Sequence, residues 1–133
     1  MLHAEREAYV EACFTRSVKP TRREVRAGID YNMSVTLAEL QRLIHDIYDA
    51  KDRRRGVEGT FLWFMQEVGE LATALRNGSH EERTLEFADV LAWLATLANI
   101  AGVDLESAIQ AKYGAGCPGC SQSPCVCDPT DKP

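Results

Sequence analysis

The sequence predicts an all-α protein built on an antiparallel hairpin of two helices. Apolar residues recur at intervals of three and four, helix-end motifs bracket these stretches, and no useful length alternates with a period of two. With 133 residues, 45% of them hydrophobic, the chain can form one compact domain but not two ordinary ones. We expect an N-terminal extension of unassigned function at 1–32, a helical domain at 33–114 and a cysteine-rich tail at 115–133.

The first helix is expected from about Leu37 to Arg53. Thr36 and Glu39 form a capping box, in which each side chain accepts a hydrogen bond from the backbone N–H of the other residue. Glycines at both ends of segment 56–59 indicate a linker. Thr60 is then expected to cap a second helix.

Clear stop and start signals define the remaining helices. Asn77-Gly78 is expected to end the second helix, and Ser79 with Glu82 forms another capping box that opens a third. Gly102 is expected to close the third helix, and a short fourth follows over residues 105–113. The second and third helices carry more apolar surface than a hairpin can bury by itself, so we expect dimerisation to complete the bundle.

Charge and hydropathy exclude several classes of protein. The formal net charge is −5, which gives no electrostatic reason to expect binding to a nucleic acid polymer. Acidic residues interrupt the longest apolar stretches, so there is no unbroken run of about 18 apolar residues to span a membrane. The N-terminus lacks the apolar segment of a secretory signal. These observations predict a cytoplasmic protein.

Two pairs of acidic residues carry the strongest functional signal. Glu67 and Glu70 are three positions apart, as are Glu86 and Asp89, so each pair lies on one side of its helix. Both pairs are also equally distant from Gly78, at eight positions for the inner acids and eleven for the outer ones. A hairpin that turns at this glycine therefore brings the two pairs together.

Four carboxylates in a partly apolar groove repel one another unless a cation lies among them. Ligation by oxygen alone suits Mg²⁺ or Mn²⁺, and Mg²⁺ also takes phosphate oxygens as ligands. Two other interpretations remain open. The acids can be ordinary solvated helix residues, or they can form salt bridges to basic residues of a partner.

The sequence around these acids resembles the MazG-like nucleoside triphosphate pyrophosphohydrolases, and in particular members with a cysteine-rich C-terminal tail. Gln66-Glu-Val-Gly-Glu-Leu71, followed by Glu86-Phe-Ala-Asp-Val-Leu91, is similar to the E-E-x-x-E and E-x-x-D motifs of that superfamily. The resemblance covers about Leu37 to Tyr113. It implies a small helical core that assembles as a homodimer or homotetramer.

The resemblance also implies a reaction and its ligands. The expected activity is Mg²⁺-dependent hydrolysis of an NTP or dNTP at the α–β linkage, giving a nucleoside monophosphate and pyrophosphate. Phosphoribosyl-ATP pyrophosphohydrolase, of the same superfamily, is the alternative enzyme. Glu67 is our candidate for the general base. The resemblance assigns the Mg²⁺ to Glu67, Glu70, Glu86 and Asp89.

Other positions match the family only in part. Gln66 replaces the first glutamate of its motif, which puts any role of that position in doubt. Lys112 matches a lysine near the substrate in relatives, but Gly116 stands where they carry asparagine. Trp93 follows Asp89 by one helical turn, where relatives often place an aromatic residue near the nucleotide, although a core position is equally compatible.

Two further groups of residues could contact a nucleotide. Arg54 belongs to the basic run 51–55, whose guanidinium groups match phosphate oxygens, and a solvated helix end is the competing interpretation. Phe61, Trp63 and Phe64 offer stacking surface, although aromatic residues at helical spacing more often belong to a core.

The tail contains four cysteines within eleven positions: Cys117, Cys120, Cys125 and Cys127. Four thiolates at short spacing suit a closed tetrahedral Zn²⁺ site. A redox-active tail and a disordered tail are the alternatives, and Cys13 is too distant in sequence to be assigned. These cysteines keep a non-enzymatic hypothesis open, in which the chain is a zinc-binding helical adaptor.

Overall fold

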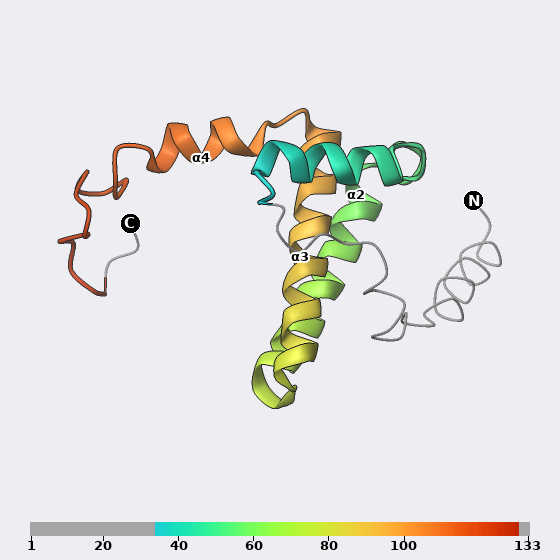
Figure 1. Ribbon diagram of the computed structural model, residues 1–133, viewed down its shortest axis with the longest axis horizontal. Coiled ribbons are helices and arrows are strands. Elements are labelled where there is room, and N and C mark those ends of the chain that lie inside the picture. Colours follow the sequence, from blue (N-terminus) through green and yellow to red (C-terminus); the bar gives the residue numbers. More distant parts are fainter. Residues whose placement is uncertain (1–33, 131–133) are drawn as a thin grey trace. The chain divides into compact units, whose positions relative to one another are not determined.

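The computed structural model describes residues 34–130, so the expectations for residues 1–32, and Cys13 with them, lie outside the described part. Figure 1 shows the three helices of this part, which contains no strand. They are α2 (Leu37–Asn77), α3 (His80–Ala101) and α4 (Leu105–Tyr113). The C-terminal half of α2 and α3 run antiparallel as a hairpin (Figure 1). The predicted all-α class is confirmed.

The middle of α2 differs from its prediction. At its start the expected capping box is present: the Glu39 N–H donates to Thr36 Oγ1 over 3.2 Å and the Thr36 N–H donates to Glu39 Oε2 over 2.8 Å. The predicted separation into two helices is present, but the four-residue linker at 56–59 is too long: the two parts of α2 meet across a kink at Gly56 alone, with φ 75° and ψ 177°. Helix resumes at once, so Thr60 is a fully buried residue inside α2 and not a cap.

The hairpin turn forms as the sequence predicts. The Gly78 N–H donates to the Ala74 carbonyl over 2.7 Å and ends α2. A side chain at Gly78 would place its Cβ 2.7 Å from that same oxygen, so the close approach favours glycine. Ser79 and Glu82 form the second capping box, and Gly102 ends α3 in the left-handed conformation, with φ 68°.

The buried side chain of Gln41 forms hydrogen bonds that join the start of α2 to the junction of α3 and α4. Its Nε2 donates to Asn99 Oδ1 over 3.1 Å and to the Val103 carbonyl over 2.9 Å. Its Oε1 accepts from the Leu105 N–H over 2.7 Å. In return, Asn99 Nδ2 donates to the Gln41 carbonyl over 2.9 Å. One amide therefore satisfies backbone groups at the end of α3 and the start of α4.

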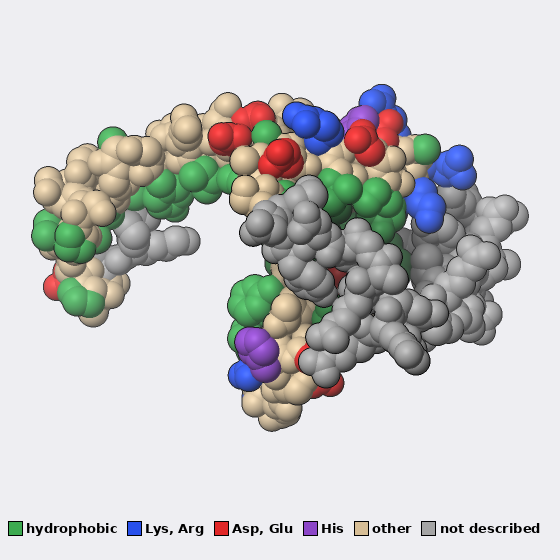
Figure 2. Space-filling view, in the orientation of Figure 1, with side chains coloured by type: hydrophobic (Ala, Val, Ile, Leu, Met, Phe, Trp, Pro, Cys, Tyr) green, Lys and Arg blue, Asp and Glu red, His purple; other side chains and the backbone are tan. Residues whose placement is uncertain are grey.

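Much apolar surface stays exposed in the described part of the chain. The buried hydrophobic residues there are Ile44, Ala74, Ala95 and Ala98. Figure 2 shows hydrophobic side chains at the surface of the hairpin and along α4. The exposed large side chains of the hairpin include Phe61, Leu62, Met65, Leu75, Leu85, Phe87, Leu91 and Leu94.

Helix α3 is long and apolar enough to cross a membrane when judged by length and composition alone. The mean hydropathy of an 18-residue stretch of α3 is 1.3, and 17% of that stretch is buried. Glu86 and Asp89 interrupt α3, as the sequence predicts, but this criterion tolerates two charged residues, so α3 is a candidate that the sequence expectation did not include. We interpret α3 as part of a helical bundle, because it packs along α2 and carries Glu86 and Asp89.

Candidate metal centre

Three glutamates from the two arms of the hairpin come together. Glu67 and Glu70 project from α2 and Glu86 from α3, and one carboxylate oxygen of each lies within 4.8 Å of the others. Asp89 stands outside this three-way cluster, but its charge acts on Glu67. The structure thus brings three of the four predicted ligands into one group and keeps the fourth beside it.

The carboxyl group of Glu67 is strongly perturbed. Burial disfavours its ionised form, and the charges of Glu70, Asp89 and Glu86 add to this effect, so its pKa rises to about 7. A hydrogen bond from the Trp93 side chain lowers the pKa in part. The crowding of negative charge that the sequence predicts is therefore present.

The residues present fit a hard divalent cation. Every side chain of the cluster is a carboxylate, and oxygen ligands at short mutual distances suit Mg²⁺ or Mn²⁺. Burial is the main reason for the raised pKa of Glu67, and a cation among these groups would remove the repulsion that adds to it.

Gln66 acquires a role that its sequence position left in doubt. Its Nε2 donates to Glu70 Oε1 over 3.0 Å, between positions i and i+4 of α2. A glutamate at this position could accept a hydrogen bond but could not donate one while ionised. The amide therefore orients Glu70 without adding a further negative charge to the cluster.

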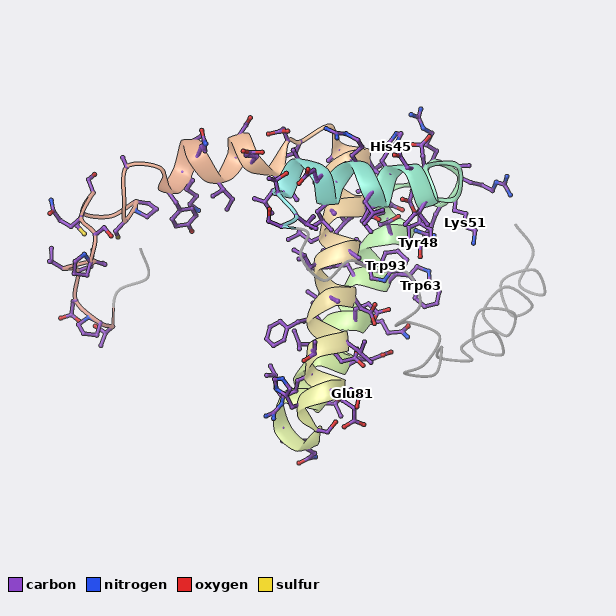
Figure 3. All side chains as sticks on the ribbon, viewed as in Figure 1. His45, Tyr48, Lys51, Trp63, Glu81 and Trp93 are labelled. Atoms are coloured by element: carbon purple, nitrogen blue, oxygen red, sulfur yellow. The ribbon has the colours of Figure 1, made fainter. Side chains whose placement is uncertain are left out.

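An aromatic pair stands next to the acids. The rings of Trp63 and Trp93 are stacked, with centroids 6.0 Å apart and planes 13° from parallel, and Figure 3 shows them side by side. Both residues are half-buried, and Trp93 contacts Glu67 through its side-chain hydrogen bond. Phe61 and Phe64 contact each other instead, with ring centroids 6.3 Å apart.

Arg55 is a component of the site that the sequence did not single out from its basic run. Its guanidinium carbon lies 4.9 Å from the centroid of the Trp93 ring. Its Nη1 forms an ion pair with Asp52 over 3.1 Å and contacts Thr60 Oγ1 at 3.4 Å. A Cβ at Gly59 would lie 2.8 Å from the Arg55 side chain, so this glycine makes room for it. The sequence signal that could have indicated this placement of Arg55 was the Gly-x-x-Gly pattern at 56–59, which we interpreted as a linker.

The other predicted substrate contacts are exposed basic side chains. Arg54 is exposed, and its neighbour Arg53 is paired with Asp49 over 2.8 Å. Lys112 is exposed on α4, where its Nζ lies 5.5 Å from the ring centroid of Tyr113. Figure 1 shows α4 leading away from the hairpin. The structure thus does not place Lys112 beside the acidic cluster.

The tail brings its four cysteines into a second cluster, with all four sulfur atoms within 4.8 Å of one another. Hydrogen bonds from the backbone N–H groups of Val126 and Gln122 lower the pKa of Cys120 to about 6. Backbone N–H groups of Cys120 and Gly119 also lower the pKa of Cys117. This loop therefore favours the thiolate form of two of its cysteines.

Fold and site together define the class, an all-α protein whose helical hairpin gathers carboxylates fit to hold a divalent cation. Residues 55–118 match the family model described as MazG nucleotide pyrophosphohydrolase domain, and this segment belongs to that family. The curated proteins include no match to the chain. The matched segment contains all four predicted acids and ends between the first and second cysteines of the tail.

Proposed function

We propose that this chain is a divalent-cation-dependent nucleoside triphosphate pyrophosphohydrolase. It would cleave an NTP or dNTP at the α–β linkage to a nucleoside monophosphate and pyrophosphate. The observation that carries the proposal is the meeting of Glu67, Glu70 and Glu86 within a segment of the MazG family. An anionic triphosphate can approach so acidic a surface only when a cation lies between them, which accounts for Mg²⁺ or Mn²⁺ as the cofactor.

Bound Mg²⁺ would neutralise phosphate charge and polarise the scissile phosphorus. The chain itself positions and activates the reacting groups. Glu67 is the proposed general base, because the cation would keep its carboxylate ionised and an ionised carboxylate can accept a proton from an attacking water. Trp93 orients it, and Gln66 orients the neighbouring ligand Glu70. The proposed ligands are Glu67, Glu70, Glu86 and Asp89.

The nucleotide would lie along the aromatic pair beside the acids. Trp63 and Trp93 offer a flat, half-buried apolar surface next to Glu67, which suits contact with a base. The exposed guanidinium of Arg54 remains the proposed phosphate contact from the basic run. Lys112 does not enter the proposal, because α4 leads away from the hairpin that carries the acids (Figure 1).

The test is pyrophosphate release by the full chain across the common ribo- and deoxyribonucleoside triphosphates and phosphoribosyl-ATP, with and without Mg²⁺. Glu70→Gln and Asp89→Asn should each lower kcat/KM by about 100-fold or more, as expected when a charge-stabilising group is lost. Glu81→Gln is the matched control, since Glu81 is exposed in the first turn of α3 and lies near the far end of the hairpin (Figure 3).

Two outcomes would end the proposal. Full activity in both acid variants would show that the cluster is not the catalytic centre. No pyrophosphate from any substrate, with Mg²⁺ and nucleotide nevertheless bound in calorimetry, would favour a structural helical dimer whose acids bind metal without turnover. Release from phosphoribosyl-ATP alone would keep the chemistry and assign the alternative substrate.

We further propose that the enzyme is a homodimer or homotetramer in the cytoplasm. A second copy is the occupant that suits the apolar surface, because helices of the same kind can cover one another's exposed leucine and phenylalanine side chains. Analytical ultracentrifugation measures the assembly. A monomer at micromolar concentration would contradict this proposal without affecting the assignment of the acids.

A further inference from the structure

The cysteine cluster of the tail has the dimensions of a metal-binding site. Sγ of Cys117 lies 3.9 Å from Sγ of Cys127 and 3.4 Å from Sγ of Cys125, and the Sγ atoms of Cys120 and Cys125 are 3.8 Å apart. Four sulfur ligands at about 2.3 Å from a tetrahedral Zn²⁺ lie about 3.8 Å from one another. A disulfide requires about 2.05 Å. The observed separations match the tetrahedron and not the disulfide.

The backbone of the loop is arranged to support charged sulfur. The Gly119 N–H donates to Cys117 Sγ over 3.4 Å, and the Cys127 N–H donates to Cys125 Sγ over the same distance. In each case the donor follows the cysteine by two residues, so each half of the cluster carries the same N–H to sulfur contact. Such donors stabilise the thiolate, which is the form that binds metal.

Short backbone contacts close the loop around the sulfur atoms. The Cys117 N–H donates to the Gln122 carbonyl over 3.1 Å, and the Ser121 N–H donates to the Cys117 carbonyl over 2.7 Å. Gly116 has φ 104°, and a Cβ there would lie 3.0 Å from the Gln122 carbonyl oxygen. A residue with a side chain at this position would therefore strain the loop, so the glycine lets the chain turn into the cysteine cluster.

We propose that Cys117, Cys120, Cys125 and Cys127 bind one Zn²⁺ in a closed tetrahedral site. Binding would release the remaining thiol protons to solvent and leave the four thiolates with the ion at a net charge of −2. Since sulfur would fill all four positions, no position is open for water or substrate, and the site is structural. It lies almost wholly beyond the matched family segment, which ends at residue 118.

The inference does not depend on the proposed reaction. The acidic centre offers only oxygen ligands from α2 and α3, whereas the tail cluster offers only sulfur from residues after α4. Hard Mg²⁺ and soft Zn²⁺ should therefore bind to different parts of the chain. A failure of the zinc site would leave the assignment of the acids unchanged, and the reverse also holds.

The test is the metal content of the full chain, purified under reducing conditions and measured by inductively coupled plasma mass spectrometry. We expect about one zinc per chain. The double variant Cys117→Ser/Cys120→Ser should carry at least about ten-fold less, whereas the control Cys13→Ser, which keeps the four tail cysteines, should retain it. Circular dichroism of the double variant should still show the helices, because the hairpin contains none of the four ligands.

A second measurement avoids reliance on variants. Co²⁺ added to zinc-stripped protein should give sulfur-to-cobalt charge-transfer absorption and the intense visible bands of tetrahedral Co²⁺, and Zn²⁺ should abolish both. Zinc retained by the double variant, iron in place of zinc, or two disulfides in the purified chain would each overturn the proposal. Cobalt bound without charge-transfer absorption would also overturn it.

Discussion

Binding of Mg²⁺ to the acidic centre should release a proton from Glu67. With a pKa of about 7, this carboxyl group is protonated in about half of the molecules at pH 7, in about nine of ten at pH 6 and in about one of ten at pH 8. A ligating carboxylate must be ionised, so the cation competes with this proton. We therefore expect the apparent affinity for Mg²⁺ to be about ten-fold weaker at pH 6 than at pH 8, or about 1.4 kcal/mol.

Isothermal titration calorimetry in two buffers of different ionisation enthalpy measures the proton directly. About 0.5 proton per Mg²⁺ should be released at pH 7 and about 0.9 at pH 6. The Glu67→Gln variant should bind Mg²⁺ more weakly, with an affinity that does not change between pH 6 and pH 8. The control Glu81→Gln should bind Mg²⁺ as the wild type does. Equal wild-type affinity at pH 6 and pH 8, with no proton released, would refute the reasoning.

The same carboxyl group sets the pH dependence of the metal-free protein. Its folded pKa of about 7 exceeds the ordinary value of 4.5, so the folded state binds the proton more tightly than the unfolded state does. Its favourable contribution is complete below about pH 4.5 and is lost as the pH rises through about 7. The melting temperature without Mg²⁺ should therefore fall from pH 5 to pH 8, and less so in Glu67→Gln.

Three further predictions concern stability, each measured as the free energy of unfolding in urea. Gly56→Ala should cost about 1–3 kcal/mol, because φ 75° with ψ 177° is open only to glycine, whereas Gly69→Ala, at a helical site with open space, should be neutral or stabilising. Arg55→Met should cost about 3 kcal/mol, because it leaves the buried Asp52 without its ion pair. Arg53→Met, which loses only an exposed pair, should cost much less. Gln41→Leu should cost about 1–3 kcal/mol, because it leaves the part-buried backbone groups of Val103 and Leu105 without these hydrogen bonds. An equal loss of unfolding free energy in Arg55→Met and Arg53→Met would contradict the buried ion pair. Equal effects of Gly56→Ala and Gly69→Ala would contradict the role of Gly56, and wild-type stability of Gln41→Leu would contradict that of Gln41.

Helix boundaries were largely predictable from local sequence. Both capping boxes, at Thr36 and Ser79, join residues only three positions apart, so their hydrogen bonds form within a single turn. The turn at Gly78 and the left-handed Gly102 are equally local. The expected linker at 56–59 was too long because its two glycines have different roles: Gly56 makes the break, whereas Gly59 is helical and is kept small for the Arg55 side chain.

The candidate site was predictable to the extent that helical periodicity fixes the side of a helix on which each side chain lies. Spacing of three residues and equal distance from Gly78 placed Glu67, Glu70 and Glu86 together, and the structure has them within 4.8 Å. Spacing alone did not predict that Asp89 would lie outside this cluster, nor that Gln66 would form a hydrogen bond with Glu70. The rotation of each helix about its axis, which side-chain packing sets, decides such details.

The sequence by itself determined the helices, their caps and the paired acids, because these depend on neighbours within one or two helical turns. Only the tertiary structure decided that Arg55 turns inward from its basic run to Trp93 and Asp52, and that four irregularly spaced cysteines approach tetrahedral distances. Those contacts depend on where the chain bends, at Gly56 and at Gly116. Glycine identity permits such backbone angles, and the surrounding packing selects them.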